Sequence, residues 1–124
     1  MSKTVMIVDD ESVVVDIAKR KLESLGFNAV VAYDGQEAMD KLNSERPDLI
    51  ILDVQMPRMN GYTFLTELRK HPNSTVAATP VVVVTAYADN NPIFTRHGIK
   101  AYLLKPLKLE KLIEKVQELV GAAK

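Results

Sequence analysis

Five short apolar runs recur along the sequence, and they limit the possible folds more than any other feature. The runs are TVMIV (4–8), NAVVA (28–32), LIIL (49–52), VVVV (81–84) and AYLL (101–104). They are rich in β-branched residues and mostly lack the alternation of polar and apolar side chains that a strand with one wet face shows. Strands of this kind are covered on both faces. The sequence therefore predicts a five-stranded parallel sheet between layers of helices.

The segments between the runs have helical spacing. Apolar stripes mark helices over 12–25, 35–44, 60–70 and 109–120. The stripe of the first helix consists of Val14, Ile17, Ala18, Leu22 and Leu25. Regular alternation of strand and helix predicts an α/β fold of the doubly wound (βα)5 type.

Several residues indicate where these helices begin and end. Gly26 stands where the first helix would end in a left-handed conformation. Asp34 and Glu37 have the spacing of a capping box, and Asn60 is a candidate cap for the third helix. Lys108 precedes the last helix without the side-chain oxygen that a good cap supplies.

The stretch AYADNNPIFTRHGIK (86–100) fits this pattern poorly. It should contain the fourth helix, but it carries Pro92, which can start a helix and cannot stand inside one. Asn90 and Asn91 precede the proline, and Gly98 follows after only a few residues. We expect the fourth helix to be short or irregular, with one or two turns.

Composition excludes several classes of protein. With 124 residues, the chain fits one domain over 1–124. Sixteen Lys and Arg balance sixteen Asp and Glu, so no net field favours nucleic acid or an anionic membrane. The absence of cysteine excludes disulfides, thiolate metal sites and a cysteine nucleophile. No signal peptide or membrane-spanning run is evident, and we expect a cytoplasmic protein.

Polar residues follow four of the five expected strands. In doubly wound sheets, ligands bind beyond the carboxyl ends of the strands. The residues at these ends are Asp9, Asp10 and Glu11, then Asp53, Thr85, and Lys105 with Pro106. Carboxylates that lie close together repel one another and need a cation, and oxygen ligands suit Mg²⁺ or Mn²⁺. We choose Mg²⁺ on ligand type.

A magnesium site beside a lysine and a threonine is equipped for phosphoryl transfer, which depends on positioning and on neutralising charge. Asp53 would be the nucleophile and would form an acyl phosphate. Lys105 would pair with the new negative charge, and the Thr85 hydroxyl would donate a hydrogen bond to a phosphoryl oxygen.

Taken together, these motifs resemble the receiver domain of two-component response regulators over essentially the whole chain. The resemblance is carried by IVDDE (7–11), LDVQMPRMNG (52–61), VVVVTA (81–86) and YLLKP (102–106), in the same order on the same strand ends. It implies a flavodoxin-like fold with strand order 2-1-3-4-5, as in the stand-alone chemotaxis regulators of the family. It also implies phosphorylation of Asp53 by a sensor histidine kinase or a histidine phosphotransfer protein.

The resemblance also implies roles for individual residues. Asp10 and Asp53 would bind Mg²⁺ directly, Asp9 would act through water, and the main-chain carbonyl of Gln55 would complete the protein ligands. Lys105 would precede a cis peptide bond at Pro106.

Other implied roles concern the response to phosphorylation. Thr85 and Tyr102 would form a coupled switch. Gln55 and Tyr87 would tune the lifetime of the acyl phosphate. Val13 and Val15 are candidate contacts for a kinase beside the first helix. The output would be a contact with a downstream protein target or passage of the phosphoryl group onward, because a stand-alone receiver has no attached DNA-binding or catalytic module. The chain would catalyse only its own phosphorylation and dephosphorylation.

Three other functions are compatible with parts of the pattern. A flavin mononucleotide protein shares the fold but needs a hydroxyl- and glycine-rich loop after the first strand, where this chain is acidic. An aspartyl phosphohydrolase needs a second aspartate two residues after the nucleophile, where this chain has Gln55. A receiver-like module that binds proteins without phosphorylation is the remaining alternative.

Overall fold

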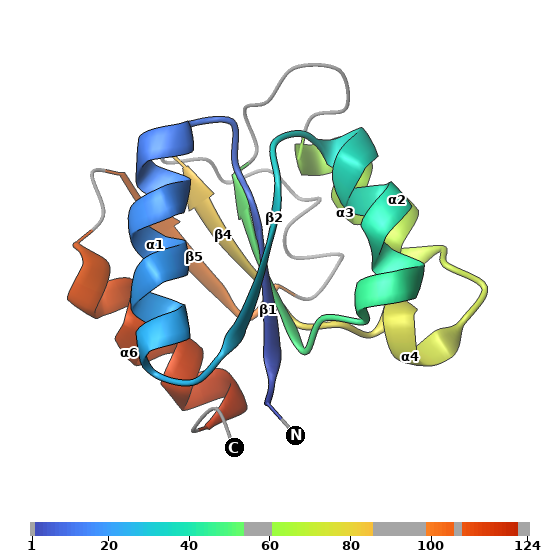
Figure 1. Cartoon of the computed structure of the whole chain (residues 1–124). Coiled ribbons are helices and arrows are strands. Elements are labelled where there is room, and N and C mark those ends of the chain that lie inside the picture. Colours follow the sequence, from blue (N-terminus) through green and yellow to red (C-terminus); the bar gives the residue numbers. More distant parts are fainter. Residues whose placement is uncertain (1, 54–60, 86–98, 106–107, 122–124) are drawn as a thin grey trace.

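The computed structural model describes residues 2–53, 61–85, 99–105 and 108–121. Strands and helices follow one another in the order β1 (Thr4–Val8), α1 (Ser12–Ser24), β2 (Asn28–Ala32), α2 (Gly35–Glu45), β3 (Leu49–Asp53), α3 (Gly61–Arg69), α4 (Ser74–Ala77), β4 (Val81–Thr85), β5 (Ala101–Leu104) and α6 (Leu109–Val120) (Figure 1). All five predicted strands are present, and each agrees with its apolar run to within one residue.

The strands form one parallel sheet in the order β2-β1-β3-β4-β5. This confirms the doubly wound, flavodoxin-like topology and the strand order that the family resemblance implies. β1 and β3 lie side by side near the middle of the sheet, with Val8 paired to Leu52. Their carboxyl ends therefore meet at one edge of the sheet.

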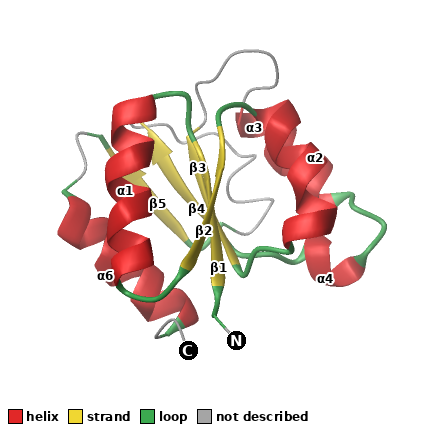
Figure 2. Cartoon of the chain, viewed as in Figure 1, coloured by secondary structure: helices red, strands yellow, loops and turns green. Residues whose placement is uncertain are grey.

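Helices cover both faces of the sheet. α1 and α6 lie on one face, and α2, α3 and α4 lie on the other (Figures 1 and 2). Alternate residues of each central strand enter the two cores: Ile7 and Ile51 pack with α1 and α6, whereas Met6 and Ile50 pack with α2 and α3. Every residue of β1 and β3 is buried. Both faces of these strands therefore need apolar side chains, and polar and apolar residues do not alternate along them.

The ends of α1 and α2 follow the sequence signals closely. Gly26 has φ of 95°, the left-handed conformation predicted after α1. At α2, Oδ1 of Asp34 accepts a hydrogen bond from the Glu37 N–H at 2.8 Å. In the usual capping box, the Glu37 side chain would accept a hydrogen bond from the N–H of the cap residue, Asp34. Here Oε1 of Glu37 accepts instead from the N–H of Tyr33, one residue earlier.

The buried face of α1 differs from the predicted stripe. Ala18 and Leu22 are buried as expected, but Val14 and Ile17 are 45% and 52% exposed, and Val15 is 1% exposed. Residues 13–15 are all valine. Helical spacing is therefore compatible with an apolar stripe that begins at Val14 and with one that begins at Val15. In the folded chain, α1 buries the stripe that contains Val15, Ala18 and Leu22.

The short helix α4 lies in a stretch for which no element is predicted. Its cap is Asn73, whose side-chain oxygen accepts from the N–H groups of Thr75 and Val76. Arg69, at the end of α3, donates from Nη1 to the carbonyl oxygens of Ala77 at 2.9 Å and of Thr79 at 2.7 Å. Burial of this guanidinium lowers the pKa of Arg69.

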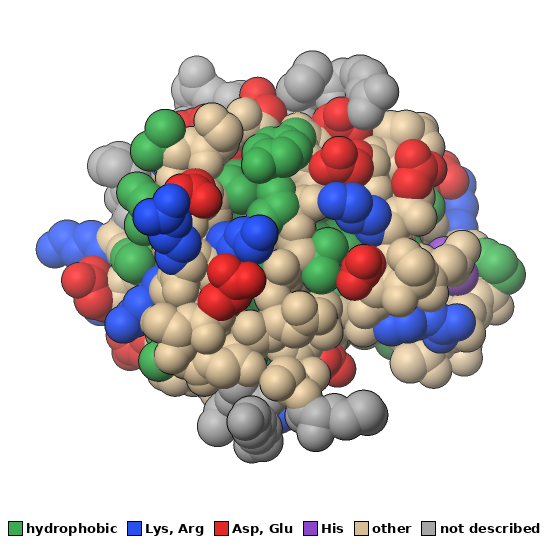
Figure 3. All heavy atoms as spheres, in the orientation of Figure 1, with side chains coloured by type: hydrophobic (Ala, Val, Ile, Leu, Met, Phe, Trp, Pro, Cys, Tyr) green, Lys and Arg blue, Asp and Glu red, His purple; other side chains and the backbone are tan. Residues whose placement is uncertain are grey.

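Two expectations about helices fall outside the described residues. These are the short or irregular fourth helix within 86–98 and the cap at Asn60. In the described part of the chain, no helix is both long enough and apolar enough to cross a membrane. On the face drawn in Figure 3, basic and acidic side chains lie intermixed, in keeping with their equal numbers in the sequence.

Candidate functional site

Three aspartates meet at the carboxyl edge of the sheet. Asp9 directly follows β1, Asp10 precedes α1, and Asp53 is the last residue of β3. One carboxylate oxygen from each lies within 4.8 Å of the other two. As whole residues, Asp9 and Asp53 are only 6% and 5% exposed, whereas Asp10 is exposed. The structure thus brings together three of the residues that the sequence predicts for a metal site.

The loop after β1 is fixed by hydrogen bonds of its own. The N–H of Asp9 donates to the carbonyl oxygen of Ala32 at 3.1 Å, which continues the ladder between β1 and β2. Oδ1 of Asp9 accepts from the N–H of Glu11 at 2.9 Å. Its Oδ2 atom faces Lys105. Asp9 therefore connects the start of α1 to the cationic side of the site.

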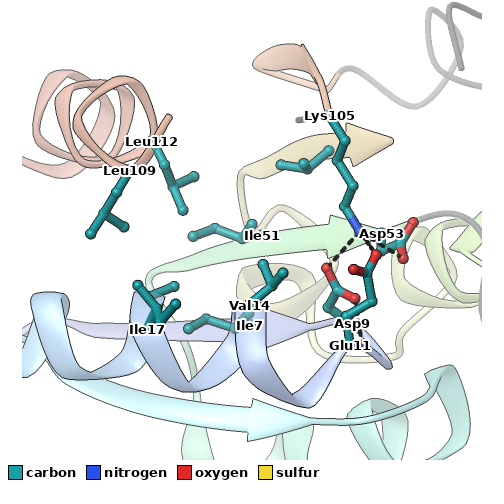
Figure 4. A pocket seen from close by; sticks show the side chains of 12 residues that line it. Ile7, Asp9, Glu11, Val14, Ile17, Ile51, Asp53, Lys105, Leu109 and Leu112 are labelled. Atoms are coloured by element: carbon teal, nitrogen blue, oxygen red, sulfur yellow. Dashed lines mark hydrogen bonds and ion pairs between the residues drawn. The ribbon is translucent and has the colours of Figure 1, made fainter. Parts of the chain in front are cut away.

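Lys105 follows β5 and directs its ammonium group into the acidic cluster (Figure 4). Its Nζ lies 2.6 Å from Oε1 of Glu11, 3.1 Å from Oδ2 of Asp9 and 3.4 Å from Oδ2 of Asp53. Burial by itself lowers the pKa of Lys105, but hydrogen bonds to Glu11 and Asp9 and the charges of Asp9 and Asp53 raise that pKa above its ordinary value. The ammonium stays charged at neutral pH and offsets part of the carboxylate repulsion.

Thr85 and Tyr102 lie on the two strands that adjoin this site. Thr85 is the last residue of β4, and the sheet register pairs it with Leu104, directly before Lys105. Tyr102 lies on β5 opposite Val83 and packs, partly buried, against the core under α2 and α3. The backbone therefore brings the two predicted switch residues to adjacent strands.

Three predicted site residues lie in the segments 54–60, 86–98 and 106–107. Gln55, Tyr87 and Pro106, with their predicted roles as metal ligand, lifetime-tuning positions and cis peptide, lie outside the described residues. For Thr85, the structure describes the backbone and not the side chain.

Glu11 is a site residue that the sequence reasoning leaves without a role. It belongs to the acidic run after β1, but its exposed position directly before α1 is that of an ordinary helix-start residue. Its contact with Lys105 spans 94 positions, so no local pattern indicates it. The sequence offers one indication of this contact: carboxylates outnumber cations at the strand ends, so several carboxylates must share Lys105.

A pocket of about 530 Å³ extends from these charged groups between α1 and α6. Asp9, Glu11, Asp53 and Lys105 line its polar end, and the remaining lining residues are Ile7, Val14, Ile17, Ala18, Ile51, Val84, Leu109 and Leu112. Figure 4 shows the aliphatic side chains away from the cluster of charges. The exposure of Val14 and Ile17 follows from this opening, since α6 does not cover that side of α1.

The donor set suits a hard divalent cation. The three aspartates offer only oxygen atoms, and the two buried ones lie beside the Lys105 ammonium. Oxygen ligands in a partly hydrated site favour Mg²⁺ over softer metals. The acidic cluster therefore fits Mg²⁺.

Comparisons with known proteins agree with this geometry. The family model for the response regulator receiver domain matches residues 5–117. Response regulator MprA of Mycobacterium bovis is 35% identical over the whole chain, which covers 53% of that protein. The chain thus spans about half the length of this relative.

Solved structures show the same relationship. The Vibrio cholerae chemotaxis protein CheY4 is 29% identical, with a TM-score of 0.87, and the match covers 97% of this chain and all of that one. The response regulator TrrA of Thermotoga maritima, solved in complex with Mg²⁺ and BeF, is 30% identical, with a TM-score of 0.80, over 95% of this chain and 99% of that one. The sheet edge bears an acidic cluster and a lysine, and the matched family model and these relatives agree with that arrangement. The chain therefore belongs to the receiver domains of two-component response regulators.

Proposed function

We propose that this receiver accepts a phosphoryl group on Asp53 from a sensor histidine kinase or a histidine phosphotransfer protein, in a reaction that requires Mg²⁺. The observation that supports this most directly is the cluster of Asp9, Asp10 and Asp53 with the Lys105 ammonium at its side. Buried carboxylates are costly unless a cation accompanies them, so the cluster is suited to metal and phosphate chemistry.

In this reaction, a carboxylate oxygen of Asp53 attacks the phosphorus atom of a phosphohistidine. The bond between phosphorus and the imidazole nitrogen breaks, and its electron pair returns to that nitrogen. When bound, Mg²⁺ supplies positive charge that offsets the charge of the transferring oxygens. Asp10 and Asp53 would hold the ion directly, with the carbonyl of Gln55, and Asp9 would hold it through water.

Lys105 supplies the second positive charge. Phosphorylation replaces one carboxylate charge by a group that carries about −1.5 to −2. The Lys105 ammonium, already 3.4 Å from Oδ2 of Asp53, would pair with the new charge. The Thr85 hydroxyl would donate to a phosphoryl oxygen, and Tyr102 would turn inward as Thr85 moves, which alters a surface that a downstream protein reads.

The partner surface of the proposed reaction includes the exposed side of α1. Val13 is 70% exposed, and Val14 and Ile17 beside it border the pocket that ends at Asp53. A protein that brings its histidine to Asp53 would cover these apolar side chains. Val15 is excluded as a contact because only 1% of its surface is exposed.

In this proposal, the chain does not turn over a small-molecule substrate. It would catalyse only its own phosphorylation and the hydrolysis of the resulting acyl phosphate, in the cytoplasm, where histidine kinases present their phosphoryl groups. The proposal for this chain itself is a phosphorylation-dependent protein contact over residues 1–124, without direct binding of nucleic acid or membrane.

Incubation with acetyl phosphate and Mg²⁺ tests the proposed function. Intact-mass spectrometry should show one added phosphoryl group that hydroxylamine removes, and Asp53→Asn should abolish it. Glu23→Gln, which neutralises an exposed carboxylate in the last turns of α1, is the matched control and should leave phosphorylation unchanged. A folded wild type that no donor phosphorylates would instead favour the alternative, a receiver-like module that binds proteins without phosphorylation.

A further inference from the structure

The Lys105 ammonium has its shortest contact with Glu11, not with either buried aspartate. The distance from Nζ to Oε1 of Glu11 is 2.6 Å, against 3.1 Å to Asp9 and 3.4 Å to Asp53. The three side chains also differ in burial: Glu11 is 54% exposed, whereas Asp9 and Asp53 are 8% and 5% exposed. One cation is thus shared between two buried carboxylates and one at the rim.

The backbone of Glu11 is anchored, whereas its side chain is half-exposed at the rim of the site. Its N–H donates to Oδ1 of Asp9, and its carbonyl oxygen accepts from the N–H of Val15 at 3.0 Å, which fixes it at the start of α1. Figure 4 shows Glu11, Asp9 and Asp53 around the end of the Lys105 side chain. A small rotation of Lys105 therefore exchanges one carboxylate for another without movement of the backbone.

Electrostatics makes this exchange consequential. A divalent cation held by Asp53 and Asp10 would repel the Lys105 ammonium and would compete with it for the oxygens of the aspartates. Glu11 offers the ammonium a partner outside the metal cluster. A phosphoryl group on Asp53 then presents oxygens that carry more charge than the Glu11 carboxylate and attract the ammonium back.

We propose that Glu11 is a positioning residue that holds the Lys105 ammonium at the rim of the site and releases it to the phosphoryl group on Asp53. This inference rests on the proposed function and specifies how the same site is regulated. Glu11 touches neither the phosphoryl group nor the metal; it acts through Lys105. It stabilises the metal-loaded, unphosphorylated state relative to the phosphorylated one.

Removal of the Glu11 charge should therefore change two affinities in opposite directions. In Glu11→Gln, Lys105 stays with Asp9 and Asp53 and competes with the metal, so Mg²⁺ binds about two- to fivefold more weakly, the range expected for a half-exposed ion pair. At saturating Mg²⁺, beryllofluoride, a phosphoryl mimic, should bind about two- to fivefold more tightly, because Lys105 no longer has to leave Glu11. A general loss of structure would weaken both.

Isothermal titration calorimetry measures both affinities on the full chain, with Glu23→Gln as the control expected to match the wild type. NMR of ¹³C-labelled lysine side chains, with the Lys105 signal assigned from Lys105→Met, should show that signal shifted by Glu11→Gln in the metal-free protein. Glu11→Asp keeps the charge but shortens the side chain by one methylene group. It should shift the Lys105 signal and tighten beryllofluoride binding, as Glu11→Gln does.

Three results would overturn the inference. They are a fall of both affinities in Glu11→Gln, an unchanged Lys105 signal in that variant, and wild-type behaviour of Glu11→Asp, which would mean that only long-range charge matters. The Mg²⁺ titration and the Lys105 signal require no phosphorylation. Failure of Asp53 to accept a phosphoryl group would therefore be distinguishable from failure of the role of Glu11.

Discussion

Asp53 and Lys105 are separated by 52 positions in the sequence, yet Nζ of Lys105 lies 3.4 Å from Oδ2 of Asp53. The sheet brings them together, because β3 and β5 both flank β4 and all three run in the same direction. Their carboxyl ends meet at one edge, where ligand sites of doubly wound sheets form. The proposed phosphoacceptor and the cation that would stabilise its product are thus placed by topology.

Replacement of Lys105 by Met keeps the approximate length of the side chain and removes its charge. The buried carboxylates of Asp9 and Asp53 lose the Lys105 ammonium as a partner. Mg²⁺ should therefore bind roughly tenfold more tightly, as expected when one close competing charge is lost at a partly exposed site. Phosphorylation by acetyl phosphate should slow by about a hundredfold, because charge on the transferring oxygens loses a partner. Calorimetry and rapid quenching would measure the two effects; tighter metal binding without slower phosphorylation would refute the proposed role of Lys105.

The raised pKa of Lys105 predicts a pH dependence of stability. Burial lowers this pKa, but Glu11, Asp9 and Asp53 raise it more, so it exceeds its ordinary value of 10.5 in the folded chain. A group with a raised folded-state pKa stabilises the fold fully below its unfolded pKa and loses that contribution as pH rises through the folded value. Urea unfolding of the wild type should therefore show an extra loss of stability above about pH 10.5, absent from Lys105→Met. Parallel pH curves for the two proteins would contradict this.

The exposed apolar surface of α1 predicts a difference between phosphodonors. Val13 is 70% exposed, so Val13→Asp should leave the fold and phosphorylation by acetyl phosphate unchanged. Phosphotransfer from a cognate kinase or phosphotransfer protein should slow by about tenfold or more, because a charge would be buried in the contact. Ser24→Asp, at the exposed end of the same helix, adds the same single charge and is the control. Equal rates with both kinds of donor would show that Val13 is not a contact.

The burial of Val15 predicts unequal effects of two neighbouring substitutions. Val15→Ala should lower the free energy of unfolding by about 2 kcal/mol, because two buried methyl groups are lost. Val14→Ala removes the same atoms from a position that is 45% exposed and should cost less than about 0.5 kcal/mol. Urea denaturation of both variants would measure the difference. The reverse order would mean that α1 buries the stripe expected from helical spacing.

Local sequence determined most of the secondary structure. The run LIIL before Asp53 predicts a buried strand because both faces of the strand must be apolar, and β3 has no exposed residue. Gly26 and Asp34 mark the boundaries of α1 and α2 through backbone conformation and a side-chain cap, which act over a few residues. The motifs at the strand ends also identify Asp9, Asp10, Asp53 and Lys105 as neighbours, because the carboxyl ends of parallel strands meet at one edge of the sheet.

Tertiary structure decided features that depend on how elements lie against one another. Three consecutive valines in α1 satisfy more than one helical stripe, and only packing on the sheet buries Val15 and leaves Val14 exposed. The end of helix α4 receives hydrogen bonds from Arg69, whose guanidinium reaches carbonyl groups 8 and 10 residues away. The contact of Glu11 with Lys105 also depends on tertiary structure. A cation near several carboxylates pairs according to distance and burial. A local sequence pattern specifies neither of these quantities.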